Sequence, residues 1–83
     1  MIQILGVLPS PPSSGQTVCI SYSGGAAASV TINFDGGPPT TLTPVHGANG
    51  LSTACFVLPP GIRGTGVVIA DGSDVVQTYI TSL

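Results

Sequence analysis

The sequence predicts an all-β fold, an antiparallel β-sandwich of about seven short strands in a single domain of residues 1–83. Two patterns indicate this fold. Apolar and polar residues alternate along the chain, and glycine and proline clusters interrupt the alternation about every eight to twelve positions, the spacing typical of sandwiches and barrels. Helices are not expected, because the strong helix formers lysine and glutamate are absent.

Glycine and proline are frequent, at 12 and 8 residues. Such a content can indicate disorder, but disordered chains combine low hydrophobicity with high charge. Here 42% of the residues are hydrophobic and 5% are charged. The composition therefore predicts a folded domain in which glycine and proline mark turns. A domain of this length buries roughly 60% of its unfolded surface, so we expect a modest core.

The first two strands are predicted at Ile2–Leu8, with Ile2 and Ile4 on one face, and at Gln16–Ser23. The segment PSPPSSG between them is expected to be an extended linker or edge, because proline fixes the backbone and has no N–H to donate. The connection after the second strand, GGAAA, is expected to be a loose loop.

The clearest strand is Ser29–Phe34, in which every second residue is apolar. Asp35–Pro39 forms a turn, since glycine permits positive φ and proline presets the next residue. The segment TTLTPV is predicted to be one short edge strand around Leu42, because Pro44 excludes it from a central position. HGANG is a further turn.

Three strands complete the chain, at Leu51–Leu58, Thr65–Ala70 and Val75–Ser82. PPGIRG connects the first two, and the tight turn DGSD joins the last two in a hairpin. The inward positions of five of the strands give the predicted core: Val18, Ile20, Tyr22, Val30, Ile32, Phe34, Phe56, Val67, Ile69 and Ile80. Seven short strands in a chain of this size favour an immunoglobulin-type sandwich over a closed barrel, although the tryptophan of antibody domains is absent.

Three segments, SSGQTVCISYSG, ASVTINFDGG and ACFVLPPGIRGTGVVIADGS, follow an opening strand that ends in proline. Together they resemble the IPT/TIG-type immunoglobulin-like domains over nearly the whole chain. The chain departs from that family where GGAAAS replaces the usual G-x-N/G-F. The resemblance implies an immunoglobulin-like fold and an adhesion, glycan-associated or structural spacer role. Similar sandwiches also occur as outer decorations of phage capsids, and a stand-alone copy looks most like these.

The two cysteines, Cys19 and Cys55, lie on strands that are neighbours in this fold, and both are expected on the outer face. One interpretation is a disulfide, which would contribute roughly 3–4 kcal/mol by constraining the unfolded chain. The other is two free cysteines that behave as small apolar groups.

No residue pattern predicts catalysis, a metal site or a cofactor. His46 is expected to be a solvated loop histidine, because no G-x-S-x-G nucleophile motif accompanies it. Structural zinc needs about four ligands, and only His46 could join the cysteines. Asp71, Ser73 and Asp74 are too few oxygen ligands for calcium and suit a hairpin turn.

The charged residues are Asp35, Asp71, Asp74 and Arg63, which give a formal net charge of −2. Nucleic acid and anionic membranes need clustered cations, so neither is an expected partner. No apolar run approaches the ~20 residues that span a bilayer, and no signal peptide is expected at the N-terminus. Arg63 has three interpretations: it pairs with an aspartate, it keeps its loop hydrated, or it anchors a protein partner.

We therefore expect a non-enzymatic structural module that decorates a viral capsid or a similar large assembly and that self-associates, at a virion surface. An uncharged surface suits a protein that is packed against another. The expected partner contacts are Pro11, Pro12, Pro38, Pro39, Ile62 and Arg63. The alternative is a glycan-binding or adhesion module of a secreted or cell-surface protein.

Overall fold

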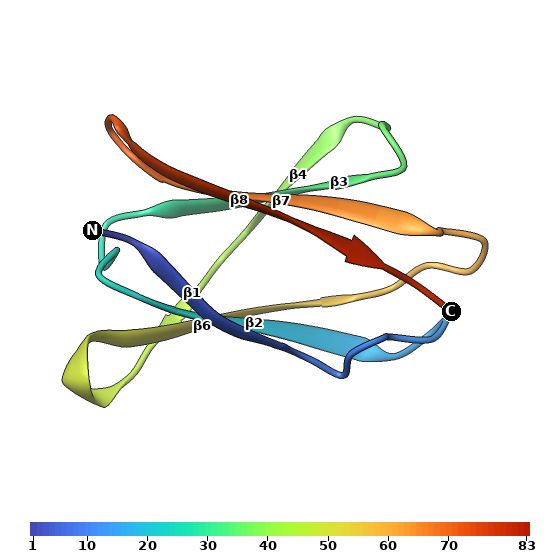
Figure 1. The fold of residues 1–83 in the computed structure, drawn as a ribbon, viewed down its shortest axis with the longest axis horizontal. Helices are drawn as coiled ribbons and strands as arrows, with labels where there is room; N and C mark the ends of the chain where they lie inside the picture. Colours follow the sequence, from blue (N-terminus) through green and yellow to red (C-terminus); the bar gives the residue numbers. More distant parts are fainter.

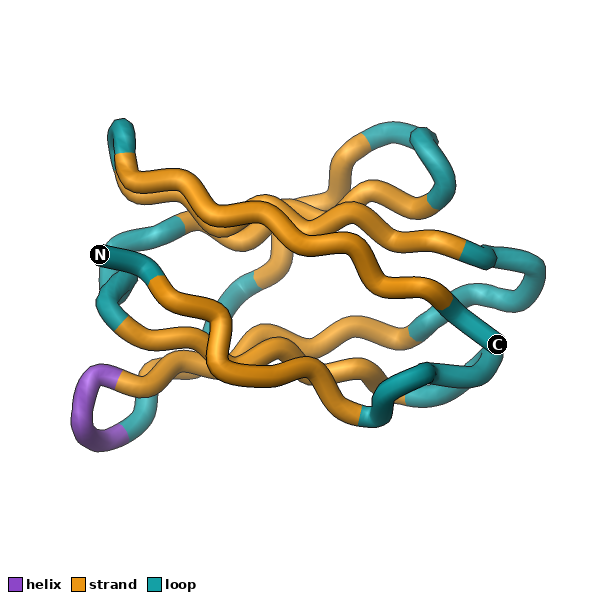
Figure 2. Tube along the Cα trace, viewed as in Figure 1, coloured by secondary structure: helices purple, strands orange, loops and turns teal.

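Eight strands form two four-stranded antiparallel sheets that pack face to face in a computed structural model, which describes all residues 1–83 (Figure 1). The first sheet has the order β1-β2-β6-β5 and the second the order β4-β3-β7-β8. The strands are β1 (Gln3–Leu8), β2 (Thr17–Ser23), β3 (Ser29–Phe34), β4 (Pro39–Leu42), β5 (Val45–His46), β6 (Leu51–Val57), β7 (Gly64–Asp71) and β8 (Asp74–Thr81). The predicted β-sandwich is confirmed. Loops and a single short 3₁₀ turn at Ala48–Gly50 connect the strands (Figure 2).

The predicted single edge strand around Leu42 is wrong, because the segment forms two strands in different sheets. β4 pairs with β3 at the edge of the second sheet, whereas β5 pairs with β6 at the edge of the first. Thr43 and Pro44 lie between them and carry the chain from one sheet to the other. Pro44 ends the pairing of β4 because it cannot donate a backbone hydrogen bond.

The core lies between the inward faces of the two sheets. All but one of the predicted core residues are buried, and the exception, Phe34, is half-buried and packs against the core. Its ring meets Phe56 edge to face, with 5.7 Å between the centroids. Four further residues complete the core: Ile2, Ala28, Ala54 and Leu58.

A β-bulge in β1 lets this strand bury residues from both of its halves. Ile4 pairs with Tyr22, and Gly6 pairs with Ser21, so Leu5 is the extra residue. The bulge shifts the alternation by one position. As a result Ile4 and Val7 both pack against the core, while Leu5 is exposed.

The buried core residues should contribute most of the stability of the fold. We expect Ile32→Ala to lower the free energy of unfolding by about 2–5 kcal/mol, because Ile32 is 1% exposed and its truncation leaves a cavity. Thr31→Ala is the matched control on the opposite face of the same strand and should cost less than about 1 kcal/mol. Urea denaturation measures both values, and equal losses would contradict this account of the core.

Candidate functional site

The charged side chains lie at the two ends of the sandwich. Asp35 and Arg63 belong to loops at one end, and Asp71 and Asp74 close the β7–β8 hairpin at the other. The strands of the first sheet contain no aspartate or arginine. Recognition by the sheet faces must therefore depend on apolar and neutral polar groups.

Asp35 joins two loops through main-chain hydrogen bonds. Its Oδ2 accepts a bond from the Arg63 N–H at 3.1 Å, and its Oδ1 accepts one from the Gly64 N–H at 2.9 Å. In return, the Asp35 N–H donates to the Gly64 carbonyl at 2.9 Å. Asp35 has φ 46°, in the left-handed region, which aspartate enters more readily than most residues.

The Arg63 guanidinium forms no ion pair, so the predicted pairing of Arg63 with an aspartate is wrong. Asp35 binds the main chain of Arg63 and leaves its side chain exposed. The one ion pair of the structure joins the N-terminal ammonium to Asp74. Hydration of the loop and contact with a partner are the two interpretations that fit a free, exposed guanidinium.

The other expected contacts gather near Arg63, at what we call the loop end, formed by residues 9–16, 35–38 and 58–63 (Figure 1). Main-chain bonds connect these loops, including Gly15 N–H to the Leu58 carbonyl at 2.8 Å. Pro11 and Pro38 are exposed there, Ile62 is half-buried against the core, and the exposed Pro39 follows as the first residue of β4.

Pro12 does not belong to this exposed set. Its side chain is fully buried, so the prediction that it contacts a partner is wrong. The Pro12 carbonyl accepts a hydrogen bond from the Leu83 N–H at 2.9 Å, which pins the loop against the end of the last strand. A surface loop rich in proline thus contributes one residue to the packing of the sandwich.

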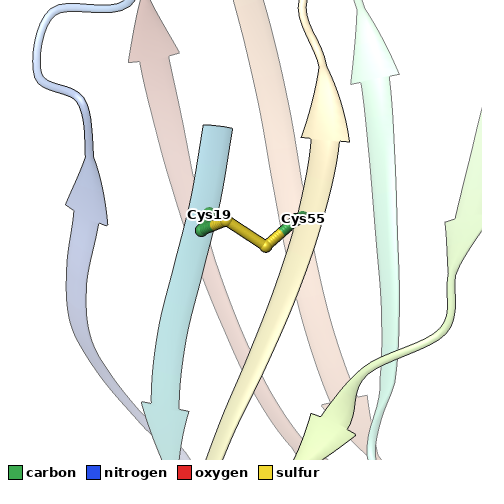
Figure 3. Close-up of a disulfide and its surroundings, with 2 residues drawn as sticks. All are labelled: Cys19 and Cys55. Carbon is green, nitrogen blue, oxygen red and sulfur yellow. A yellow bond between two sulfur atoms is a disulfide. The ribbon is translucent and has the colours of Figure 1, made fainter. Parts of the chain in front are cut away.

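Cys19 and Cys55 form a disulfide between the neighbouring strands β2 and β6 (Figure 3). The two residues are directly opposite in the register, and their Cα atoms are 4.1 Å apart. This separation is typical of a non-hydrogen-bonded antiparallel pair, in which side chains approach most closely. Cys55 is exposed and Cys19 is half-buried, so the bond lies on the outer face.

Exposed apolar side chains surround this disulfide on the outer face of the first sheet. Leu8 is paired with Cys19, Val57 with Thr17, and Val45 with Thr53. Leu8 and Val45 are each 73% exposed and Val57 is 59% exposed. We call this surface the sulfur face and define it by Leu8, Thr17, Cys19, Val45, Thr53, Cys55 and Val57.

Sequence reasoning did not single out Leu8, Val45 or Val57. The signal that could have identified them is an apolar residue at an outward strand position. Each of the three is paired with residues that point outward. In the second sheet the outward residues of the central strand β3 are polar, Ser29, Thr31 and Asn33, whereas β8 contributes the exposed Val75 and Tyr79.

His46 lies in strand β5 and not in a loop, so its predicted position is wrong. Its side chain is exposed, and Nδ1 lies 2.8 Å from the Oγ of the buried Ser52. No carboxylate completes a triad, since Asp35 binds the Arg63 and Gly64 amides at the loop end. The contact fastens the two-residue strand β5 to β6.

Asp71 and Asp74 are paired across the hairpin turn, and Gly72 within it has φ 61°. Asp74 Oδ2 also accepts a hydrogen bond from the Ile2 N–H at 2.8 Å, which ties the start of the chain to the hairpin. No group of three histidine, cysteine or acidic side chains is arranged to hold a metal ion.

The structure contains no helix with the length and apolar character needed to cross a lipid bilayer. No protein-family model matches the chain, and no curated protein shows a significant sequence match to it.

The Asp35 bonds give one stability prediction. Asp35→Gly should lower the free energy of unfolding by about 1–2 kcal/mol, because glycine accepts the positive φ but two N–H groups lose their carboxylate. Arg63→Ala should change it by less than about 0.5 kcal/mol, since Asp35 binds only the main chain of Arg63. Thermal unfolding of both variants provides the test, and a larger loss for Arg63→Ala would contradict the assignment.

The disulfide gives a second stability prediction. The double variant Cys19→Ala, Cys55→Ala should lose roughly 3–4 kcal/mol of unfolding free energy, because the bond closes a loop with a sequence separation of 36. Reductant should destabilise the wild type by a similar amount and leave the double variant unaffected. A variant as stable as the oxidised wild type would show that the cross-link does not stabilise the fold.

Proposed function

We propose that the chain is a non-enzymatic structural module, an immunoglobulin-like sandwich that packs on a viral capsid or a similar large assembly. The observation that carries this proposal is the sulfur face, where Leu8, Val45 and Val57 are exposed on a sheet without aspartate or arginine. Exposed apolar side chains that gather on one face in this way are typical of protein–protein contacts.

The strand order supports the immunoglobulin-like assignment. Constant-type domains place strands A, B, E and D in one sheet and C, F and G in the other. The order β1-β2-β6-β5 corresponds to the first set, and β3-β7-β8 corresponds to the second, with β4 added beside β3. The disulfide differs from that of antibody domains, because it joins β2 to β6 within one sheet and not one sheet to the other.

The disulfide is also consistent with a place outside a reducing cytosol. Disulfides persist in secreted proteins and at virion and cell surfaces. The assignment to a virion surface agrees with this chemistry, as does the extracellular alternative.

A non-enzymatic role is supported by the use of the polar side chains. The His46–Ser52 contact has no carboxylate partner, and the Asp35 and Asp74 carboxylates each accept main-chain hydrogen bonds that join separate segments. His46, Asp35 and Asp74 are thus engaged in contacts that hold the fold together.

The glycan-binding alternative has one aromatic side chain in its favour. Tyr79 is 65% exposed, whereas Tyr22 and Phe56 are buried and Phe34 is half-buried. A single ring offers one stacking platform, while the sulfur face offers several apolar side chains on one surface. The structural role is therefore the function that we propose.

Co-sedimentation with capsid particles from the same source tests the proposal. The wild type should bind saturably, and Val57→Lys should reduce binding at least about tenfold, because a charge would have to be desolvated at the contact. Thr41→Lys, on the exposed edge strand β4 of the other sheet, is the matched control and should bind normally. The loop end is examined with Arg63→Ala, whose unchanged binding would remove Arg63 as an anchor.

Wild type that neither sediments with such particles nor associates at high concentration would contradict the structural role. Equal binding by Val57→Lys and wild type would show that the sulfur face is not the contact.

A further inference from the structure

The four edge strands of the sandwich differ in how they are protected against pairing with another strand. An edge strand has unpaired backbone N–H and carbonyl groups. Proteins prevent these groups from pairing with another chain by short strands, proline, bulges or charge. β5 has two residues, and β4 has four and begins with Pro39. β1 contains the bulge at Leu5, and the segment after it contains three prolines.

β8 has none of these features within the strand, and the only segment beside its edge is that of Pro11 and Pro12, whose one backbone bond to this end of the chain is made to Leu83, beyond the strand. It is eight residues long and pairs with β7 in an unbroken register from Asp71–Asp74 to Gly64–Thr81. It contains no proline and no lysine, and its one charge, Asp74, lies at its first position. β8 is therefore the only long, regular edge of the molecule.

The register shows which backbone groups of β8 are free. Just beyond the strand, the Ser82 N–H donates to the Arg63 carbonyl at 2.8 Å, so this residue bonds towards β7. Residues of an antiparallel edge strand alternate between bonding to the neighbour and pointing away from it. The N–H and carbonyl groups of Val75, Gln77, Tyr79 and Thr81 consequently point outward from the edge. The Leu83 N–H follows the same alternation, and the Pro12 carbonyl accepts it.

A cleft of about 390 Å³ lies beside this edge, between Val7, Pro11 and Pro12 on one side and Thr78–Thr81 on the other. Prolines have no N–H, so Pro11 and Pro12 cannot donate to the outward carbonyls of β8. No backbone hydrogen bond crosses the cleft to Thr78–Thr81, so the outward groups of Tyr79 and Thr81 are not used within the chain.

We propose that β8 pairs with β8 of a second copy of this chain, antiparallel about a two-fold axis at Thr78, to make one continuous sheet. This register places Gln77 opposite Tyr79 of the second copy and Val75 opposite its Thr81. It uses all the outward groups from Val75 to Thr81 in about eight backbone hydrogen bonds.

The side chains and the charge of β8 favour a second copy of the chain as its pairing partner. On the inner face, Val76 lies opposite Ile80 of the second copy, so apolar groups meet, and the two Thr78 side chains meet at the axis. The antiparallel arrangement holds the two Asp74 carboxylates at opposite ends of the interface, whereas parallel pairing would bring these like charges together. A self-complementary patch of this kind closes as a two-fold dimer.

Amide hydrogen exchange combined with light scattering tests the pairing. As the concentration rises from below the dimer dissociation constant to well above it, the exchange of the Gln77, Tyr79 and Thr81 amides should slow by up to about tenfold, because mass action depletes the monomer. Amides that already bond to β7 should change little. Unchanged exchange at Gln77, Tyr79 and Thr81 in a protein that remains monomeric at about 1 mM, where even weak interfaces associate, would overturn the proposal.

Gln77→Pro removes one outward N–H without removing a bond to β7, and it should prevent the dimer; Gln77→Thr keeps the N–H and should dimerise as the wild type does. Thr78→Lys is a second blocking variant, since two ammonium groups would meet at the axis. If either blocking variant is folded and dimerises like Gln77→Thr, the proposal is wrong. The pairing does not involve the sulfur face, so Val57→Lys should still dimerise, which separates this test from that of the proposed function.

Discussion

Packing of β2 and β6 against β3 and β7 is the constraint on which the other features depend. In a sheet with one buried face, a shift of one residue would turn every inward side chain outward. The burial of Ile20 and Ala54 therefore fixes the register that places Cys19 directly opposite Cys55. The disulfide and the exposed residues beside it follow from the same alternation that builds the core.

With so few charges, the chain uses carboxylates mainly as hydrogen-bond acceptors for the main chain. Asp35 binds the N–H groups of Arg63 and Gly64 at the loop end, and Asp74 binds that of Ile2 at the hairpin end. Each bond joins segments that are distant in sequence. These contacts fasten the ends of a sandwich whose middle is held by apolar burial, and they leave the Arg63 guanidinium free.

The sequence was sufficient to predict the sandwich, because alternation reports directly which side chains can be buried. β3 has the predicted bounds, and the predicted core is buried except for Phe34 at its margin. Features that depend on three-dimensional placement were not predictable in this way. The bulge at Leu5, the crossing at Pro44 and the burial of Pro12 each depend on contacts with distant strands. Alternation also cannot show that Asp35 would bind the backbone of Arg63 in preference to its side chain.

The unprotected edge of β8 is informative because the chain protects its other edges without lysine. A bulge, prolines and short strands serve at β1, β4 and β5, and the same means were available for β8. A two-fold axis between antiparallel strands stands perpendicular to their sheet. In a pair joined through β8, both first sheets would therefore lie on the same side of the continuous second sheet. Their sulfur faces would point in the same direction, so that one dimer could place two of them on a single surface. Two linked contacts bind far more tightly than either alone, which would suit a module whose individual apolar face is small.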